Sequence, residues 1–263
     1  MFNVLAKTLR DKRFFILGWS FGLAFLGFAM VSFFPSFGGD QITGFLEAMP
    51  AALQGMIGDM QDWKDLPSYI GSQIFDIRLS IIITIMAIIL AIGLTVGEED
   101  KRQLQTLTAL PISRTKIAFA KWLAVVLISG FAVLATALGA EVGLLVINES
   151  LDQMVLVRLV LSTWLMVSAL VTVILALGLA TGKRAITTVA ALIITVGSFL
   201  LTTFSQSVDW LEKFSPASFF HYFPAAEIAR GTVRWEDAVV YAGLIVLSLV
   251  VTFIVFPRRD IKS

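Results

Sequence analysis

The chain has 263 residues, of which 57% are hydrophobic and 15% are charged, and its mean hydropathy is +0.87. A chain of this composition cannot stay soluble as a monomer, so the composition excludes an ordinary soluble domain and indicates an integral membrane protein. The sequence contains no cysteine, which also excludes disulfides, thiol catalysis and thiolate metal sites.

Six stretches are apolar enough to cross a bilayer, whose hydrocarbon core of about 30 Å needs roughly 20 helical residues. Helices are required because lipid offers the backbone no hydrogen-bond partner, and the alternating strands of a barrel are absent. The sequence therefore predicts an all-α integral membrane protein with six transmembrane helices, as a single transmembrane domain over residues 1–263. The predicted spans are residues 14–34, 79–97, 122–147, 159–182, 185–208 and 238–257, and Glu141 is the only charged residue inside them.

The distribution of lysine and arginine predicts the orientation of these spans. The N-terminal arm, the segment 97–121, the turn at 183–184 and the C-terminal tail hold 14 of the 20 basic residues. By the positive-inside rule, both termini and segment 97–121 lie in the cytoplasm. The connections 35–78, 148–158 and 209–237 are then the outer loops.

The first span combines a basic arm with an apolar stretch, as a signal peptide does. Residues 14–34 are too long for a cleaved apolar core and no A-x-A site follows, so we expect an uncleaved anchor. The span also contains a G-x-S-x-G pattern at residues 18–22, typical of serine hydrolases. A serine nucleophile needs a nearby base, and the sole histidine, His221, is expected on the opposite side of the membrane.

We interpret these glycines as part of small-residue faces at which helices pack closely. The predicted faces are Gly18 with Gly22 in the first span, Gly139 with Gly143 in the third, and Gly178 with Gly182 in the fourth.

In the first outer loop, apolar residues recur at helical spacing between Ile42 and Met60. This pattern predicts a helix lying in the outer membrane interface, which Pro50 starts or bends. Methionines on its apolar stripe suggest a copper site, but methionine is also ordinary apolar filler, which we favour. We therefore predict no metal site.

Segment 97–121, GEEDKRQLQTLTALPISRTKIAFAK, is the one compact run of charged and amphipathic sequence between two spans. Leu104, Leu107 and Leu110 recur every three residues among polar ones, which predicts an amphipathic helix of about three turns. Pro111 ends this helix. Ser113 is then placed to cap a second helix that runs into the third span. From the pattern alone, the first helix either meets a partner protein or rests on the inner leaflet.

Two motifs that would indicate an enzyme or a nucleotide-binding site are incomplete in this sequence. Glu98 and Glu99 suggest the paired glutamates of an intramembrane protease, but the arginine of that family would fall at Gln103 and its histidine motifs are missing. Residues 178–184, GLATGKR, have the wrong glycine spacing for a Walker A loop and place Arg184 where Ser or Thr must hold magnesium. We predict that the chain is not an enzyme, binds no cofactor and has no nucleic-acid partner.

Segment 97–121 resembles the E-x-G-T-L-E-x-L-L-x-x-P-I-S-R-x-x-I-x-x-x-K pattern of type-2 ATP-binding-cassette (ABC-2) permeases, the membrane halves of ABC exporters. Arg102 departs from the pattern, because the family often has glycine there. The likeness extends to the basic amphipathic arm, the six spans, the cytoplasmic termini and a segment of prolines and aromatics before the last span. The matching residues are Glu99, Leu104, Gln105, Leu107, Ala109, Leu110, Pro111, Ile112, Ser113, Arg114, Ile117 and Lys121.

The resemblance implies that this segment is a coupling helix and that the chain is half of a transporter. Two such permeases would pair, and two cytoplasmic ATPases carrying ATP and Mg would dock on their coupling helices. The coupling residues that it implies are Glu98, Glu99, Leu104, Leu107, Leu110, Pro111, Ser113 and Arg114.

Polar residues inside the spans are candidates for a transport pathway. Intramembrane carboxylates are usually functional, but Glu141 lies near the outer end of its span, where an interfacial carboxylate paired with Arg158 is the favoured interpretation. Hydroxyls on one face of the fifth span either bond the carbonyl four residues back or line a pathway. These hydroxyl residues are Thr188, Thr195, Ser198, Thr202 and Ser205.

The third outer loop gathers aromatic residues between Pro216 and Pro224. These residues form either an interfacial aromatic belt, which we favour, or a short helical hairpin that dips back into the outer leaflet.

These features together predict a permease subunit of an ATP-driven exporter, in the plasma membrane of a prokaryote. The uncharged spans suit a lipid, a hydrophobic peptide or a drug as substrate, with ion export as an alternative. The rival hypothesis is a scaffold or sensor subunit that docks a cytoplasmic protein without transporting anything.

Overall fold

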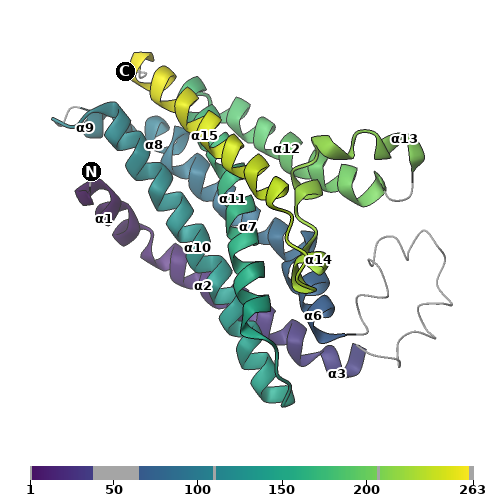
Figure 1. The fold of residues 1–263 in the computed structure, drawn as a ribbon. Helices are drawn as coiled ribbons and strands as arrows, with labels where there is room; N and C mark the ends of the chain where they lie inside the picture. Colours follow the sequence, from purple (N-terminus) through teal and green to yellow (C-terminus); the bar gives the residue numbers. More distant parts are fainter. Residues whose placement is uncertain (1, 38–64, 109–110, 206–207, 261–263) are drawn as a thin grey trace.

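The computed structural model describes residues 2–37, 65–108, 111–205 and 208–260, and within these ranges it is helical and free of strands (Figure 1). The predicted helix within 42–60 lies outside the described residues. The elements are α1 (Phe2–Asp11), α2 (Arg13–Ser32), α3 (Phe34–Phe37), α6 (Leu66–Tyr69), η3 (Ile70–Phe75), α7 (Ile77–Leu94), α8 (Val96–Asp100), α9 (Gln103–Thr108), α10 (Arg114–Ile147), α11 (Gln153–Thr181), α12 (Arg184–Ser205), α13 (Asp209–Glu212), η4 (Ser215–Ala217), η5 (Phe219–Tyr222), α14 (Ala225–Ala229) and α15 (Trp235–Arg258).

Six helical stretches in the described residues are long and apolar enough to cross a membrane, which confirms the predicted all-α membrane fold. They run over Arg13–Ser36, Leu66–Asp100, Arg114–Ile147, Gln153–Thr181, Arg184–Ser205 and Trp235–Arg258. Several exceed the predicted apolar stretches, because a helix continues past the apolar part of its sequence wherever caps and tertiary contacts support it. The 34 residues of α10 span about 51 Å, well beyond the hydrocarbon core.

The core is formed by α7, α10 and α11, most of whose residues are buried, whereas only about a fifth are buried in α2, α12 and α15. Helix α2 packs along α10, and α15 packs along α11 (Figure 1). Both chain termini lie at one end of the bundle, beside α9. This common end agrees with the prediction that the termini and segment 97–121 share one side of the membrane.

Glycines allow the close contact between α2 and α10. A Cβ added at Gly139 would lie 1.9 Å from the Ala24 carbonyl oxygen, and one at Gly143 would lie 2.9 Å from that of Phe28. The predicted packing face of the third span is therefore confirmed. Gly18 and Gly22 make no such contact within the chain, since a Cβ at either position would meet nothing within 4 Å.

Within the predicted outer connection 35–78, residues 66–75 are helical. Asp65 caps α6 by accepting a hydrogen bond from the Ser68 amide at 3.0 Å, and the π-helix η3 that follows is fully buried. It packs on α14 so closely that a Cβ at Gly71 would lie 2.8 Å from the Ala225 carbonyl oxygen. Two segments distant in sequence therefore pack directly against each other.

Candidate functional site

Segment 97–121 forms two short helices and the start of a long one. Helix α8 ends at Asp100, the chain turns at Arg102 with a φ of 59°, and α9 covers only Gln103–Thr108. The predicted helix of about three turns is wrong, because the left-handed residue at 102 separates α8 from α9. Ser113 accepts a hydrogen bond from the Lys116 amide at 3.4 Å, which confirms the predicted cap of α10.

The three leucines of the predicted docking stripe do not form one exposed face. Leu104 is fully buried in the protein's own core, and Leu107 is half-buried and packs against that core. Leu110 lies outside the described residues. The assignment of Leu104 to a partner contact is therefore corrected: its side chain holds α9 onto the bundle. The exposed residues of this segment are instead polar or small, and we call them the tip. They are Lys101, Arg102, Gln103, Pro111 and Ser113.

Glu98 belongs to a buried ion pair. Its carboxylate contacts the ammonium of Lys121, whose side chain is 1% exposed. The same ammonium donates a hydrogen bond to the Leu94 carbonyl oxygen at the end of α7. A buried charge needs such partners, because removing an ammonium from water costs several kcal/mol. The pair joins the second span, which continues into α8, to the third span.

Glu99 forms a second pair, with Arg259 at the end of the last span. The Glu99 side chain is 3% exposed, and the Arg259 side chain is 13% exposed. The backbone carbonyl oxygen of Arg259 accepts a hydrogen bond from Arg114 at 2.6 Å. The guanidinium also crosses Gly182, where a Cβ would lie 1.5 Å from its Nη1 atom.

The sequence predicts no partner for Arg259. In the sequence, Arg259 is a basic residue that follows an apolar span. The positive-inside rule explains such a residue without an ion-pair partner. Sequence periodicity could not connect it with Glu99, because the two residues are 160 positions apart.

The hydroxyls of α12 bind a neighbouring segment. The Ser198 hydroxyl accepts from the Phe219 amide at 3.1 Å, and its carbonyl oxygen accepts from the Ser218 hydroxyl at 2.8 Å. The Thr202 and Ser218 hydroxyls are 2.6 Å apart. Neither residue bonds the carbonyl four residues back, so that interpretation is wrong for Ser198 and Thr202.

The remaining members of the predicted hydroxyl stripe differ in environment. Thr195 is buried, and its hydroxyl has no hydrogen-bond partner in the described residues. Ser205 bonds the Thr202 carbonyl oxygen at 3.1 Å. Thr188 is exposed and so does not share the buried face of α12, where Thr187 lies instead.

The segment bonded to α12 is the aromatic one between Pro216 and Pro224. Phe220 and Phe223 are buried in the core, and the Tyr241 hydroxyl of α15 donates to the Phe219 carbonyl oxygen. An aromatic belt facing lipid is therefore wrong for Phe220 and Phe223. The segment is folded back onto α12 and α15.

The predicted pairing of Glu141 with Arg158 is also wrong. Glu141 accepts a hydrogen bond from Gln153 at 2.8 Å, across the turn between α10 and α11. Arg158 donates to the Met154 carbonyl oxygen at 3.1 Å, one helical turn earlier. Glu141 bonds Gln153 rather than Arg158 because Gln153 begins α11, next to the end of α10.

In the part of the chain that the structure describes, no group of three or more His, Asp or Glu side chains is arranged to hold a metal ion. An exposed tip is joined by two buried ion pairs to three spans.

Comparison with known protein families gives a match over nearly the whole chain. The family described as ABC-2 family transporter protein matches residues 3–261. No curated protein matches the chain.

Proposed function

The chain belongs to the ABC-2 family of transporter proteins, and from this premise we propose that it is the permease subunit of an ATP-driven exporter. ABC-2 permeases are membrane transport components that work with ATP-binding-cassette subunits. The observation that carries the proposal is the pair of buried salt bridges behind α9, Glu98 with Lys121 and Glu99 with Arg259.

These salt bridges give an ATPase a way to move the spans. An ATPase that pushes on the exposed tip of α9 displaces α8, which carries both glutamates. Through Lys121 the displacement reaches the third span, and through Arg259 it reaches the last. Because each pair contains one buried charge, Lys121 or Glu99, separating either pair would leave that charge without a partner in a low-dielectric environment, so the connected helix ends move together.

The tip itself is the proposed docking surface. Its exposed residues, Gln103 and Pro111 among them, are polar or small, whereas the leucines of α9 face inward. We therefore place the ATPase contact on Arg102, Gln103, Pro111 and Ser113, with ATP and Mg held by the ATPase. A second permease, identical or related, would complete the transporter.

Export of a lipid, a hydrophobic peptide or a drug remains part of the proposal, with an ion as the alternative substrate. Support for export comes from the resemblance of the coupling segment. Thr195 supports a polar pathway, since its hydroxyl is buried and has no partner in the described residues. The hydroxyls of Ser198 and Thr202 already bind the outer aromatic segment, which would set the outer end of such a pathway. The proposed location is the plasma membrane of a prokaryote.

The absence of cysteine allows a direct test by crosslinking. Gln103→Cys and Pro111→Cys place a single thiol on the tip, and a bifunctional reagent should link each to an ABC ATPase that copurifies with the permease. Ser150→Cys is the control, because it is exposed but lies in the turn between α10 and α11. Copurification without any link from position 103 or 111 would reject the exposed part of segment 97–121 as the docking surface.

The rival scaffold hypothesis makes a different prediction for the same complex. In a transporter, substrate should change the ATPase rate of the complex reconstituted in liposomes, and Glu99→Gln should weaken this response while the ATPase stays bound. A scaffold that only docks the ATPase would show no substrate response in the parent protein.

A further inference from the structure

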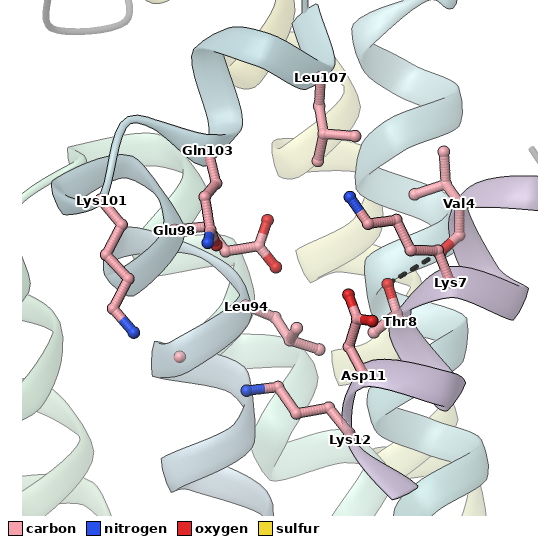
Figure 2. A pocket seen from close by; sticks show the side chains of 11 residues that line it. Val4, Lys7, Thr8, Asp11, Lys12, Leu94, Glu98, Lys101, Gln103 and Leu107 are labelled. Atoms are coloured by element: carbon pink, nitrogen blue, oxygen red, sulfur yellow. Dashed lines mark hydrogen bonds between the residues drawn. The ribbon is translucent and has the colours of Figure 1, made fainter.

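A cavity of about 390 Å³ separates α1 from the ends of α7, α8 and α9 (Figure 2). Lys7 and Asp11 extend into this space from α1, Lys12 extends into it from the residue between α1 and α2, and Leu107 points into it from α9. Lys101 lines it from the end of α8, and Val4 and Leu94 provide apolar walls. The cavity therefore combines a basic rim with an apolar interior.

The positive charge of the cavity is not neutralised by the residues around it. Lys7, Lys12 and Lys101 form no ion pair or hydrogen bond with any other side chain in the described ranges. Of the two acids that line the cavity, Glu98 is already paired with Lys121. Three lysines then face the remaining acid, Asp11, and an anion would find a net positive field.

The position of the cavity along the bundle fixes its depth in the membrane. Lys12 stands where the amphipathic α1 ends and the apolar α2 begins, and Glu98 follows the apolar stretch of the second span. Both boundaries mark the level at which apolar sequence gives way to charge. Lipid headgroups occupy this level, and basic pockets between transmembrane helices on the cytoplasmic side suit anionic headgroups.

A separate apolar groove lies between the first two spans, and its lining begins at Phe14, two residues after Lys12 of the cavity. It is lined by Phe15, Trp19 and Leu26 of α2 and by Ile82 of α7, with a volume of about 650 Å³. Gly18 and Gly22 keep it open, since a Cβ at either would meet nothing within 4 Å. Helix α2 packs mainly on α10, which leaves its side toward α7 accessible to an acyl chain.

We propose that the cavity and the groove together bind one anionic phospholipid of the cytoplasmic leaflet. Its phosphate lies among Lys7, Lys12 and Lys101, and one acyl chain lies in the groove along α2. Charge selects the headgroup, and the groove selects a lipid over a free anion. Because Leu107 of α9 lines the headgroup cavity, a bound lipid also supports the coupling segment from the side facing the membrane.

The test uses the purified, delipidated full-length protein and counts bound lipids by native mass spectrometry. Phosphatidylglycerol should bind at concentrations at which phosphatidylcholine with the same acyl chains does not. In the triple variant Lys7→Gln, Lys12→Gln, Lys101→Gln its affinity should fall roughly a hundredfold, at about fivefold per lysine near an anionic lipid. The matched control, Arg10→Gln, Lys116→Gln, Lys183→Gln, removes the same charge from exposed positions outside the cavity and should bind as the parent does.

Three outcomes overturn the proposal: equal binding of the two lipids by the parent, unchanged phosphatidylglycerol affinity in the triple variant, and displacement of the lipid by inorganic phosphate at equal concentration. The last would identify a site for free phosphate. If the triple variant does not purify, Lys101→Gln alone decides, with a loss of about fivefold expected and an unchanged affinity overturning the proposal. The measurement needs no ATPase, so its failure leaves the proposed function untouched.

Discussion

Arg102 shows how one residue sets the shape of the coupling segment. Its φ of 59° lies in the left-handed region, which costs most residues about 1–2 kcal/mol and glycine almost nothing. The related family pattern often has glycine at this position. The departure from the pattern therefore falls at the turn that separates α8 from α9, and this turn is strained by its side chain.

This strain predicts different stabilities for two substitutions at position 102. Arg102→Gly and Arg102→Val both remove the arginine side chain, but valine is β-branched and least tolerant of positive φ. We expect the valine variant to unfold about 1–2 kcal/mol more easily than the glycine variant. Thermal unfolding in detergent measures the difference, and equal midpoints would mean that the turn relaxes to another conformation.

Single residues also show where sequence inference works and where it stops. The cap at Ser113 could be predicted because capping is local chemistry between residues three apart. The orientation of Leu104 could not, because an apolar stripe has the same period whether it faces a partner or the protein's own core. Thr188 was placed with Thr195 by the same periodicity, yet only Thr195 is buried.

At the scale of elements, the contact between α2 and α10 depends on glycine. Gly139→Ala would drive a methyl group into the Ala24 backbone, which cannot move aside without displacing α2. We expect a loss of about 2–3 kcal/mol of stability, the upper part of the range for overpacking. Gly197→Ala is the control, because it is also within a helix but would meet nothing within 4 Å. Unfolding midpoints of the two variants in detergent should differ, with the control equal to or above the parent.

The link between α8 and α15 predicts an unusual order of stabilities. Arg259→Gln leaves Glu99 buried without its charged partner, which should cost about 3 kcal/mol. The double variant Glu99→Gln, Arg259→Gln removes both charges and should be more stable than Arg259→Gln alone. Thermal unfolding of the two single variants and the double variant gives the coupling energy. If the double variant is the least stable of the three, the pair does not carry the link between these elements.

For the whole molecule, hydropathy was enough to predict six spans, because lipid imposes helices of a minimum length on apolar sequence. It could not predict which spans form the core, since the peripheral α15 is more apolar than the central α11. Hydropathy also could not predict the contacts between segments that are distant in sequence. The packing of η3 on α14, the pair of Glu99 with Arg259 and the cavity beside α1 all arise from tertiary arrangement.

The orientation of the whole bundle follows from the 14 to 6 division of basic residues and predicts which single cysteines an impermeant thiol reagent reaches from outside the cell. Ser150→Cys and Ala217→Cys should react in intact cells, because both positions are exposed at the predicted outer side. Lys116→Cys and Lys183→Cys are equally exposed at the opposite end and should react only after permeabilisation. Ser68→Cys and Ser218→Cys are buried controls that should stay unlabelled in both conditions. The reverse pattern would place α9 outside the cell, where no cytoplasmic ATPase could reach it, and would remove the basis of the coupling proposal.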